Sequence, residues 1–282
     1  MSGATHITVD TDGRVFMAEE NPDRIMLDSF EAEYSKDDNL NFILTPDNGE
    51  IYTPENLKII GEMTEELWLL PFVRVVDSIT NFQNTYSLDD DLIVEDLVKD
   101  PFNISEEEAK KVKEVALSRI ELKTLDNPNT SLTNISVLFK LPGLNLQKEI
   151  PLTMEEANKL VDNFKSKYPQ MDIKMVGTVA INSLFAEASQ DDANTLVPLV
   201  IVASLIAVAI LLRTFFGTAA VLLMIILTVG VTMGSLGWSG VPMNTVTAIA
   251  PLMVVTLAVA SAVHILSSVR QTMLKTSDRT IW

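Results

Sequence analysis

Charged residues almost disappear from this chain after residue 192. Three long apolar runs then follow one another, over residues 196–212, 218–238 and 244–268. Each is close to the roughly 20 residues that an α-helix needs to cross a bilayer. The sequence therefore predicts a bundle of three transmembrane helices at the end of a chain whose earlier part is ordinary, polar protein.

The charge is divided unevenly between these two parts. Residues 193–282 carry +3 of a chain total of −17, so the residues before them carry −20. The basic residues of the last part are Arg213, Arg270, Lys275 and Arg279, and its acidic residue is Asp278. A surface this acidic is unsuited to neutralising phosphates, so we expect no nucleic-acid partner.

The basic residues also predict the topology. Arg213 lies between the first two runs and the others follow the third, whereas the connection between the second and third runs is uncharged. Loops rich in Lys and Arg stay in the cytoplasm. We therefore expect a multi-pass protein of the bacterial inner membrane, with residues 1–192 in the periplasm and residues 271–282 in the cytoplasm.

An exported first domain needs a signal sequence or a preceding membrane helix. Residues 1–16 provide neither, because they alternate like a strand. We expect that the sequence is a piece of a longer protein, in which a helix precedes Met1 and further chain follows residue 282.

Before residue 193, helix-like and strand-like periods alternate. Helices are expected over 21–34, 53–69, 106–120 and 153–168, and strands around 40–44 and over 72–79, 131–141 and 171–177. This alternation is typical of split βαβ, ferredoxin-like modules. The predicted organisation is a connecting strand and helix over 1–35, an α+β periplasmic porter-like domain over 36–192, and the helical bundle over 193–270. A helix over 180–194 is expected to join the last two.

We find no pattern typical of an enzyme. There is no cysteine, and the only histidines are His6 and His264. No nucleophile–base pair or metal-ligand spacing is visible. Asp89-Asp90-Asp91 reads as an acidic loop, because it lacks the spaced oxygens of a calcium loop. The sequence predicts no catalytic residue, no cofactor and no metal site.

Small and polar residues inside the apolar runs are the candidate site residues. Gly230, Gly234 and Gly237 lie close to one face of the second run, where small residues let helices approach closely. Pro251 is expected to kink the third helix and to free a backbone carbonyl. The candidates for a proton or ion path are Asn244, Thr247, Ser261, His264 and Ser268.

Two interpretations of His264 stay open. It precedes Arg270 by six residues, which favours a position near the cytoplasmic headgroups with the ring half in water. Alternatively, it belongs to a proton or ion path, because histidine titrates near physiological pH. Polar groups inside a bilayer usually face a bundle interior or a water path.

Several short segments also carry a family pattern. They are residues 70–82 (LPFVRVVDSITNF), then Gly177, 185–187, Asp191 and Pro198, then 242–251, and finally 259–266 (VASAVHIL). In order and spacing they resemble the resistance–nodulation–division permeases, particularly the MMPL-like and sterol-sensing-domain-like branch. The resemblance implies a twelve-helix protein of two repeats, of which this chain would be the first porter domain and helices two to four. It also implies that Ser261 stands where the branch usually has a proton-carrying aspartate.

Two functions are expected from these features. The first is export of hydrophobic or amphipathic compounds, such as lipids or drugs, driven by the proton gradient. The alternative is a non-pumping membrane protein that binds or senses sterols or lipids, or assists envelope assembly, which Ser261 favours. The expected partners are the lipid bilayer, a lipid-like substrate, the second half of the same permease, and a further copy of the chain or a periplasmic adaptor.

Overall fold

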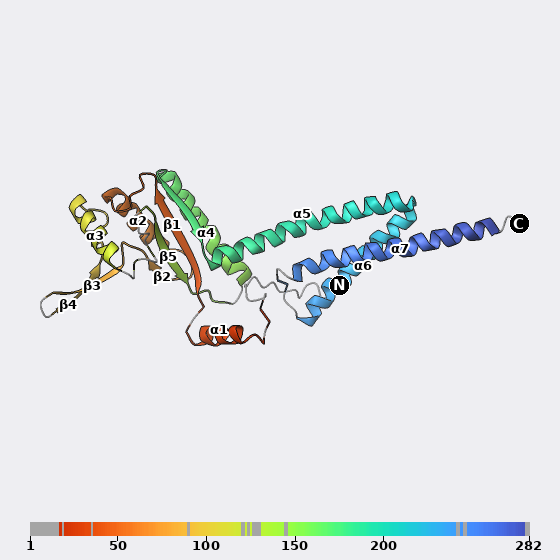
Figure 1. The fold of residues 1–282 in the computed structure, drawn as a ribbon, viewed down its shortest axis with the longest axis horizontal. Coiled ribbons are helices and arrows are strands. Elements are labelled where there is room, and N and C mark those ends of the chain that lie inside the picture. Colours follow the sequence, from red (N-terminus) through yellow and green to blue (C-terminus); the bar gives the residue numbers. More distant parts are fainter. Residues whose placement is uncertain are drawn as a thin grey trace. The chain divides into compact units, whose positions relative to one another are not determined.

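The computed structural model describes residues 17–18, 20–34, 36–88, 91–119, 122, 125, 131–143, 146–240, 243–244 and 247–279. The chain divides into two compact units (Figure 1). One consists of residues 25–183, and the other of residues 184–282 together with 1–24. The predicted strand within residues 1–16 lies outside the described residues. The helix predicted over 21–34 is present as α1 (Pro22–Glu33).

Residues 25–183 are built on a four-stranded antiparallel sheet with the order β2-β5-β1-β6. Its strands are β1 (Asp38–Pro46), β2 (Val73–Asp77), β5 (Thr133–Phe139) and β6 (Met171–Val176). Helix α2 (Pro54–Leu67) connects β1 to β2, and α4 (Leu146–Lys167) connects β5 to β6. This is the split βαβ arrangement that the alternation of elements predicts.

One face of the sheet forms the core of this unit. Leu40, Phe42 and Leu44 of β1 are fully buried, and the residues between them are only half-buried. The alternation follows from the two-residue period of a strand. Buried residues of α2 and α4, such as Met63 and Phe164, belong to the same cluster. The helices therefore cover one face of the sheet.

An insertion between β2 and β5 contains β3 (Gln83–Leu88), β4 (Asp91–Asp96) and α3 (Glu106–Ser118). The two strands form a separate antiparallel ribbon. Asp89 and Asp90 of the predicted acidic loop lie outside the described residues, and Asp91 begins β4. Ser105 and Glu108 form the predicted capping box at the start of α3.

Two element boundaries differ from the sequence prediction. Helix α4 begins at Leu146, before Pro151, whereas a start at residue 153 was expected. The strand expected over 72–79 ends at Asp77, because a turn follows in which Asn81 Oδ1 accepts from the backbone N–H of Ser78 at 2.8 Å. Beside this turn, hydrogen bonds connect the buried hydroxyl groups of Thr64, Ser78 and Thr80.

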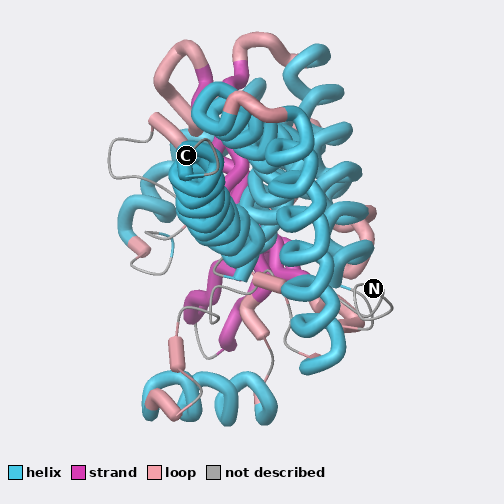
Figure 2. Tube along the Cα trace, turned by 90° about the vertical axis from the view of Figure 1, so that its right-hand side faces the viewer, coloured by secondary structure: helices cyan, strands magenta, loops and turns pink. Residues whose placement is uncertain are grey.

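Helix α1 contributes nothing to the buried core of its unit. None of its residues is buried, and the side chains of Met26, Phe30 and Tyr34 are more than half exposed. Figures 1 and 2 both show α1 away from the sheet. The rings of Phe30 and Tyr34 stack at 4.7 Å on its surface.

In the described part of residues 184–282, the helical unit contains three long helices and one short 3₁₀ turn. Helix α5 (Thr178–Leu212) begins in the other unit, and α6 (Phe215–Ser239) follows after a tight turn. The 3₁₀ turn η4 (Thr247–Ile249) leads directly into α7 (Ala250–Arg279).

Candidate functional site

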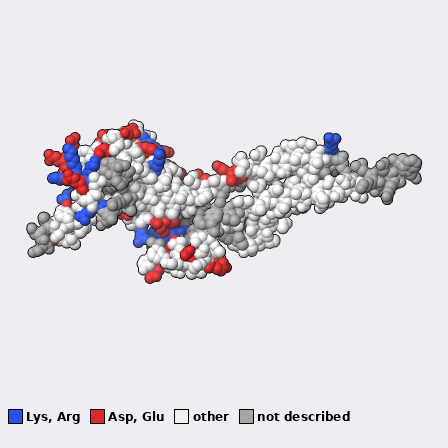
Figure 3. Space-filling model, in the orientation of Figure 1, with Lys and Arg blue, Asp and Glu red and all other residues white. Residues whose placement is uncertain are grey.

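Helices α5, α6 and α7 are all long and apolar enough to cross a membrane. In Figure 3 the surface of these helices is almost free of charge, whereas residues 25–183 carry many acidic and basic side chains. The first candidate span, Thr178–Leu211, begins well before the predicted run over 196–212, because the expected joining helix and this run form one helix, and the second, Phe215–Ser239, includes the predicted run over 218–238. The third begins at Ala250, later than the predicted residue 244, because the residues before it form the 3₁₀ turn.

The three helices share one apolar cluster. It contains Val208 of α5, Val221 and Ile225 of α6, and Val255 and Ala262 of α7, all buried. Ala258 is also buried, so α7 uses the face at 255, 258 and 262 for packing. This spacing places all three on one side of a helix.

Three polar residues of α7 lie on a different side of the helix. Ser261, His264 and Ser268 are exposed in the described structure, and Ser267 donates a hydrogen bond to the His264 carbonyl at 3.0 Å. At 100° per residue, these three residues lie roughly 60° to 120° around the helix from Ala258 and roughly 100° to 160° from Ala262. The structure therefore brings Ser261, His264 and Ser268 together on one helix face, but that face is not part of the cluster shared with α5 and α6.

Asn244 and Thr247 have a local role at the entry to α7. The Asn244 N–H donates to Thr247 Oγ1 at 2.7 Å, and the Thr247 N–H donates to Asn244 Oδ1 at 2.8 Å. Such reciprocal bonds satisfy backbone groups where a helix begins. Pro251 is the second residue of α7, where a missing N–H costs little. Pro251 was expected to kink the interior of the helix. It lies instead at the start of α7, where the 3₁₀ turn passes into the α-helix.

The glycines of α6 occupy the predicted helix. Gly234 and Gly237 are buried and Gly230 is half-buried. A Cβ added at Gly234 would meet no heavy atom within 4 Å in the described structure. Close packing of the described helices therefore does not require glycine at this position.

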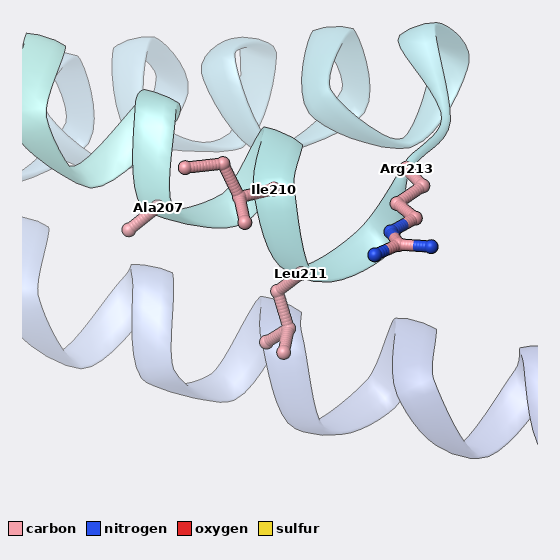
Figure 4. Close-up of a pocket in the computed structure, with 4 residues that line it drawn as sticks. All are labelled: Ala207, Ile210, Leu211 and Arg213. Carbon is pink, nitrogen blue, oxygen red and sulfur yellow. The ribbon is translucent and has the colours of Figure 1, made fainter.

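Arg213 lies in the tight turn between α5 and α6 with a positive φ of 51°. Together with Ala207, Ile210 and Leu211 it lines a shallow hollow at the end of α5 (Figure 4). Its guanidinium group is the only charged group on these lining residues. A cationic group at the end of an apolar helix agrees with a position at the membrane–water boundary.

A joint that local patterns do not reveal connects the sheet to α5. Gly177 follows β6, and Thr178 begins α5. The Thr178 N–H donates to Asn39 Oδ1 at 3.2 Å, and the Asn39 N–H donates to Thr178 Oγ1 at 2.9 Å. Val179 and Ala180 are buried in the core of the sheet unit. The first turn of the first membrane-type helix is therefore fixed to β1.

The fold and these helices define a membrane protein with an α+β unit. The family model described as "Protein export membrane protein SecD/SecF, C-terminal" matches residues 156–282. The matched segment runs from within α4 through β6 and the joint to the end of the chain. No curated protein matches the chain.

This match corrects the family assignment made from short segments. The resistance–nodulation–division assignment, with its MMPL-like and sterol-sensing branch, is wrong, because the matching family is a distinct one. All the segments from Gly177 onward that suggested it lie inside residues 156–282. They consist largely of small apolar residues, glycine and proline, which are common in membrane helices of many families.

Proposed function

We propose that this chain is part of a membrane export protein, in which the α+β unit acts outside the membrane and α5–α7 lie within it. The observation that carries the proposal is the extent of the SecD/SecF match. It continues without a break from β6 through Gly177 into α5, α6 and α7. A similarity that came only from apolar helices would not include strand β6 and the joint at Gly177.

The proposal includes a way for the two parts to act together. Movement of the sheet would be passed to α5 through the hydrogen bonds between Asn39 and Thr178 and through the buried Val179. The energy would come from the proton gradient. Between residues 193 and 269 the only ionisable side chains are Arg213 and His264, and of these two only the His264 imidazole can both accept and release a proton.

Export of amphipathic small molecules is a second candidate, favoured by α1. Its exposed apolar residues include Ile25, Met26 and Phe30, Tyr34 follows directly after it, and such a surface on a polar domain is typical of a binding face. This candidate concerns the cargo only. It uses the same α+β unit and the same three helices.

The test is performed in the organism that makes the full-length protein. The protein is depleted by repressing its gene, and newly made secretory proteins are pulse-labelled. The amount of uncleaved precursors and the efflux of a lipophilic dye are then measured in parallel. We expect precursors to accumulate several-fold, and restoration by the wild-type gene. Normal precursor processing with impaired dye efflux would favour the second candidate, and no change in either would refute both.

Proton coupling is tested in the same cells by replacing His264→Gln, with Ser267→Ala as the matched control on the same helix. Loss of restoration by the histidine variant alone is expected. Equal restoration by both variants would contradict a role of His264 in proton transfer.

A further inference from the structure

In the ribbon of β3 and β4, one hydrogen bond shows which backbone N–H and C=O groups face the partner strand and which point outward. Just beyond the ribbon, the Leu97 N–H donates to the Phe82 carbonyl at 2.7 Å, which makes this a hydrogen-bonded pair. Antiparallel pairs alternate, so the pairs Thr85–Val94 and Ser87–Leu92 have their N–H and C=O groups turned outward. An independent contact agrees, because Arg119 Nη2 donates to the outward Thr85 carbonyl at 2.7 Å.

The outer edge of β4 is open in the described part of the chain. No strand there pairs with β4 except β3, and Figure 1 shows the ribbon projecting from the four-stranded sheet. Leu92 is 72% exposed and Val94 is 55% exposed. The β3 edge differs, because Arg119 occupies the Thr85 carbonyl. An unpaired edge with exposed apolar side chains is a template for another strand.

We propose that the outer edge of β4 binds an extended, positively charged segment of a partner protein as an added strand. Backbone groups of Leu92 and Val94 would pair with the segment, and its alternate side chains would lie beside theirs. This inference goes beyond the proposed function and does not depend on it.

Charge decides which kind of strand fits. Asp91, Glu95 and Asp96 make β4 strongly acidic, and Lys99 is the basic residue that contacts this set, through Glu95 at 2.8 Å. Two copies of β4 placed edge to edge would bring these carboxylates together, which opposes self-pairing. A basic segment would gain attraction along its whole length instead. Its apolar residues would cover Leu92 and Val94.

The probe for this surface is a fluorescent octapeptide of alternating lysine and valine. Its binding to the full chain in lipid nanodiscs is measured by fluorescence anisotropy. Two further octapeptides, one of alternating glutamate and valine and one of lysine alone, serve as controls. We expect the lysine–valine peptide to bind at least tenfold more tightly than either control, because it alone combines the charge with strand-forming residues.

The variant Val94→Pro removes an outward N–H without removing a bond to β3, since proline is tolerated on strand edges. It should weaken peptide binding about tenfold or more, which corresponds to one lost backbone bond and a steric block. Thr85→Pro makes the same change on the edge occupied by Arg119 and should bind the peptide within twofold of wild type.

Val94→Lys keeps the backbone donor and adds a positive charge to the acidic strand. It should weaken the lysine–valine peptide and strengthen the glutamate–valine peptide, and it decides the question if the proline variant is misfolded. Undetectable binding to wild type, equal binding of all three peptides, or equal effects of the two proline variants would overturn the proposal. A change in oligomeric state in place of peptide binding would point to a second copy of the chain and would also overturn it.

Discussion

The joint at Gly177 allows a quantitative prediction for the change Gly177→Ala. Gly177 has a φ of +141°, a conformation that residues with a Cβ rarely adopt. A Cβ there would lie 2.5 Å from the Asn39 carbonyl oxygen and 2.7 Å from Asn39 Oδ1. Because the first of these atoms is backbone of a central strand, it cannot move without disturbing β1.

Two costs add up at this position. The strained backbone conformation costs about 1 to 3 kcal/mol. Relief of the clash requires Asn39 to move away from Thr178, which gives up one or two hydrogen bonds at about 1 kcal/mol each. We therefore expect the free energy of unfolding of the sheet unit to fall by about 2 to 5 kcal/mol.

The assay is urea unfolding of the full chain in detergent, followed by the fluorescence of Trp68. Trp238 and Trp282 are replaced by phenylalanine, so that the signal comes from the sheet unit alone. Gly49→Ala is the matched control, because Gly49 also has a positive φ of 67° but a Cβ there would meet nothing within 4 Å. It should cost only about 1 kcal/mol. If both variants unfold within about 1 kcal/mol of each other, the reasoning about the joint is refuted.

Three further predictions use the same unfolding assay or its thermal equivalent. Thr64→Val should destabilise the sheet unit by about 1 to 2 kcal/mol, because it removes the buried hydrogen bonds of Thr64 to Ser78 and Thr80, and an unchanged midpoint would contradict this. Burial raises the pKa of Glu62, but hydrogen bonds from Lys167 and the adjacent tyrosine outweigh this and hold that pKa below its ordinary value. Wild type should therefore be more stable than Glu62→Gln at pH 7 by about 0.5 to 1 kcal/mol. This difference should disappear as the pH falls below the ordinary glutamate pKa and through the lowered pKa of Glu62. A stability difference that does not depend on pH would contradict the assignment. Ala262→Leu should lower the thermal stability of the helical unit, because the added atoms enter a buried contact and cost about 1 to 3 kcal/mol, whereas Ala260→Leu on the exposed side should not.

The parts of the fold that local residues determine could be predicted from the sequence. The capping box at Ser105 involves residues three apart, and the strand around Phe42 follows from strict alternation. The β3–β4 ribbon could not be predicted this way, because polar residues such as Gln83 and Ser87 hide the alternation. The bond between Asn39 and Thr178 joins residues 139 positions apart, so no local pattern contains it.

The sequence predicts which polar residues of α7 share a helix face, but not which way that face points. The sequence shows that Ser261, His264 and Ser268 share one face of a helix, because that follows from the helical period alone. It does not show which face packs against α5 and α6. The packing of Val255, Ala258 and Ala262 settles this for the described helices.

The direction of this face has a physical consequence for a protein in a membrane. Hydrocarbon offers no hydrogen-bond partner to an imidazole ring, and polar groups at that depth are found against protein or water. The side of α7 with Ser261 and His264 is exposed in the described structure, while the side that packs against α5 and α6 consists of apolar residues. Either water reaches this stretch of α7, at the headgroups or along a water path, or further protein must lie against it. The two cases predict different results for a spin label at Ser261. A label that water reaches would be accessible to a water-soluble relaxation agent. A label covered by another helix would be shielded from that agent and from lipid-soluble oxygen.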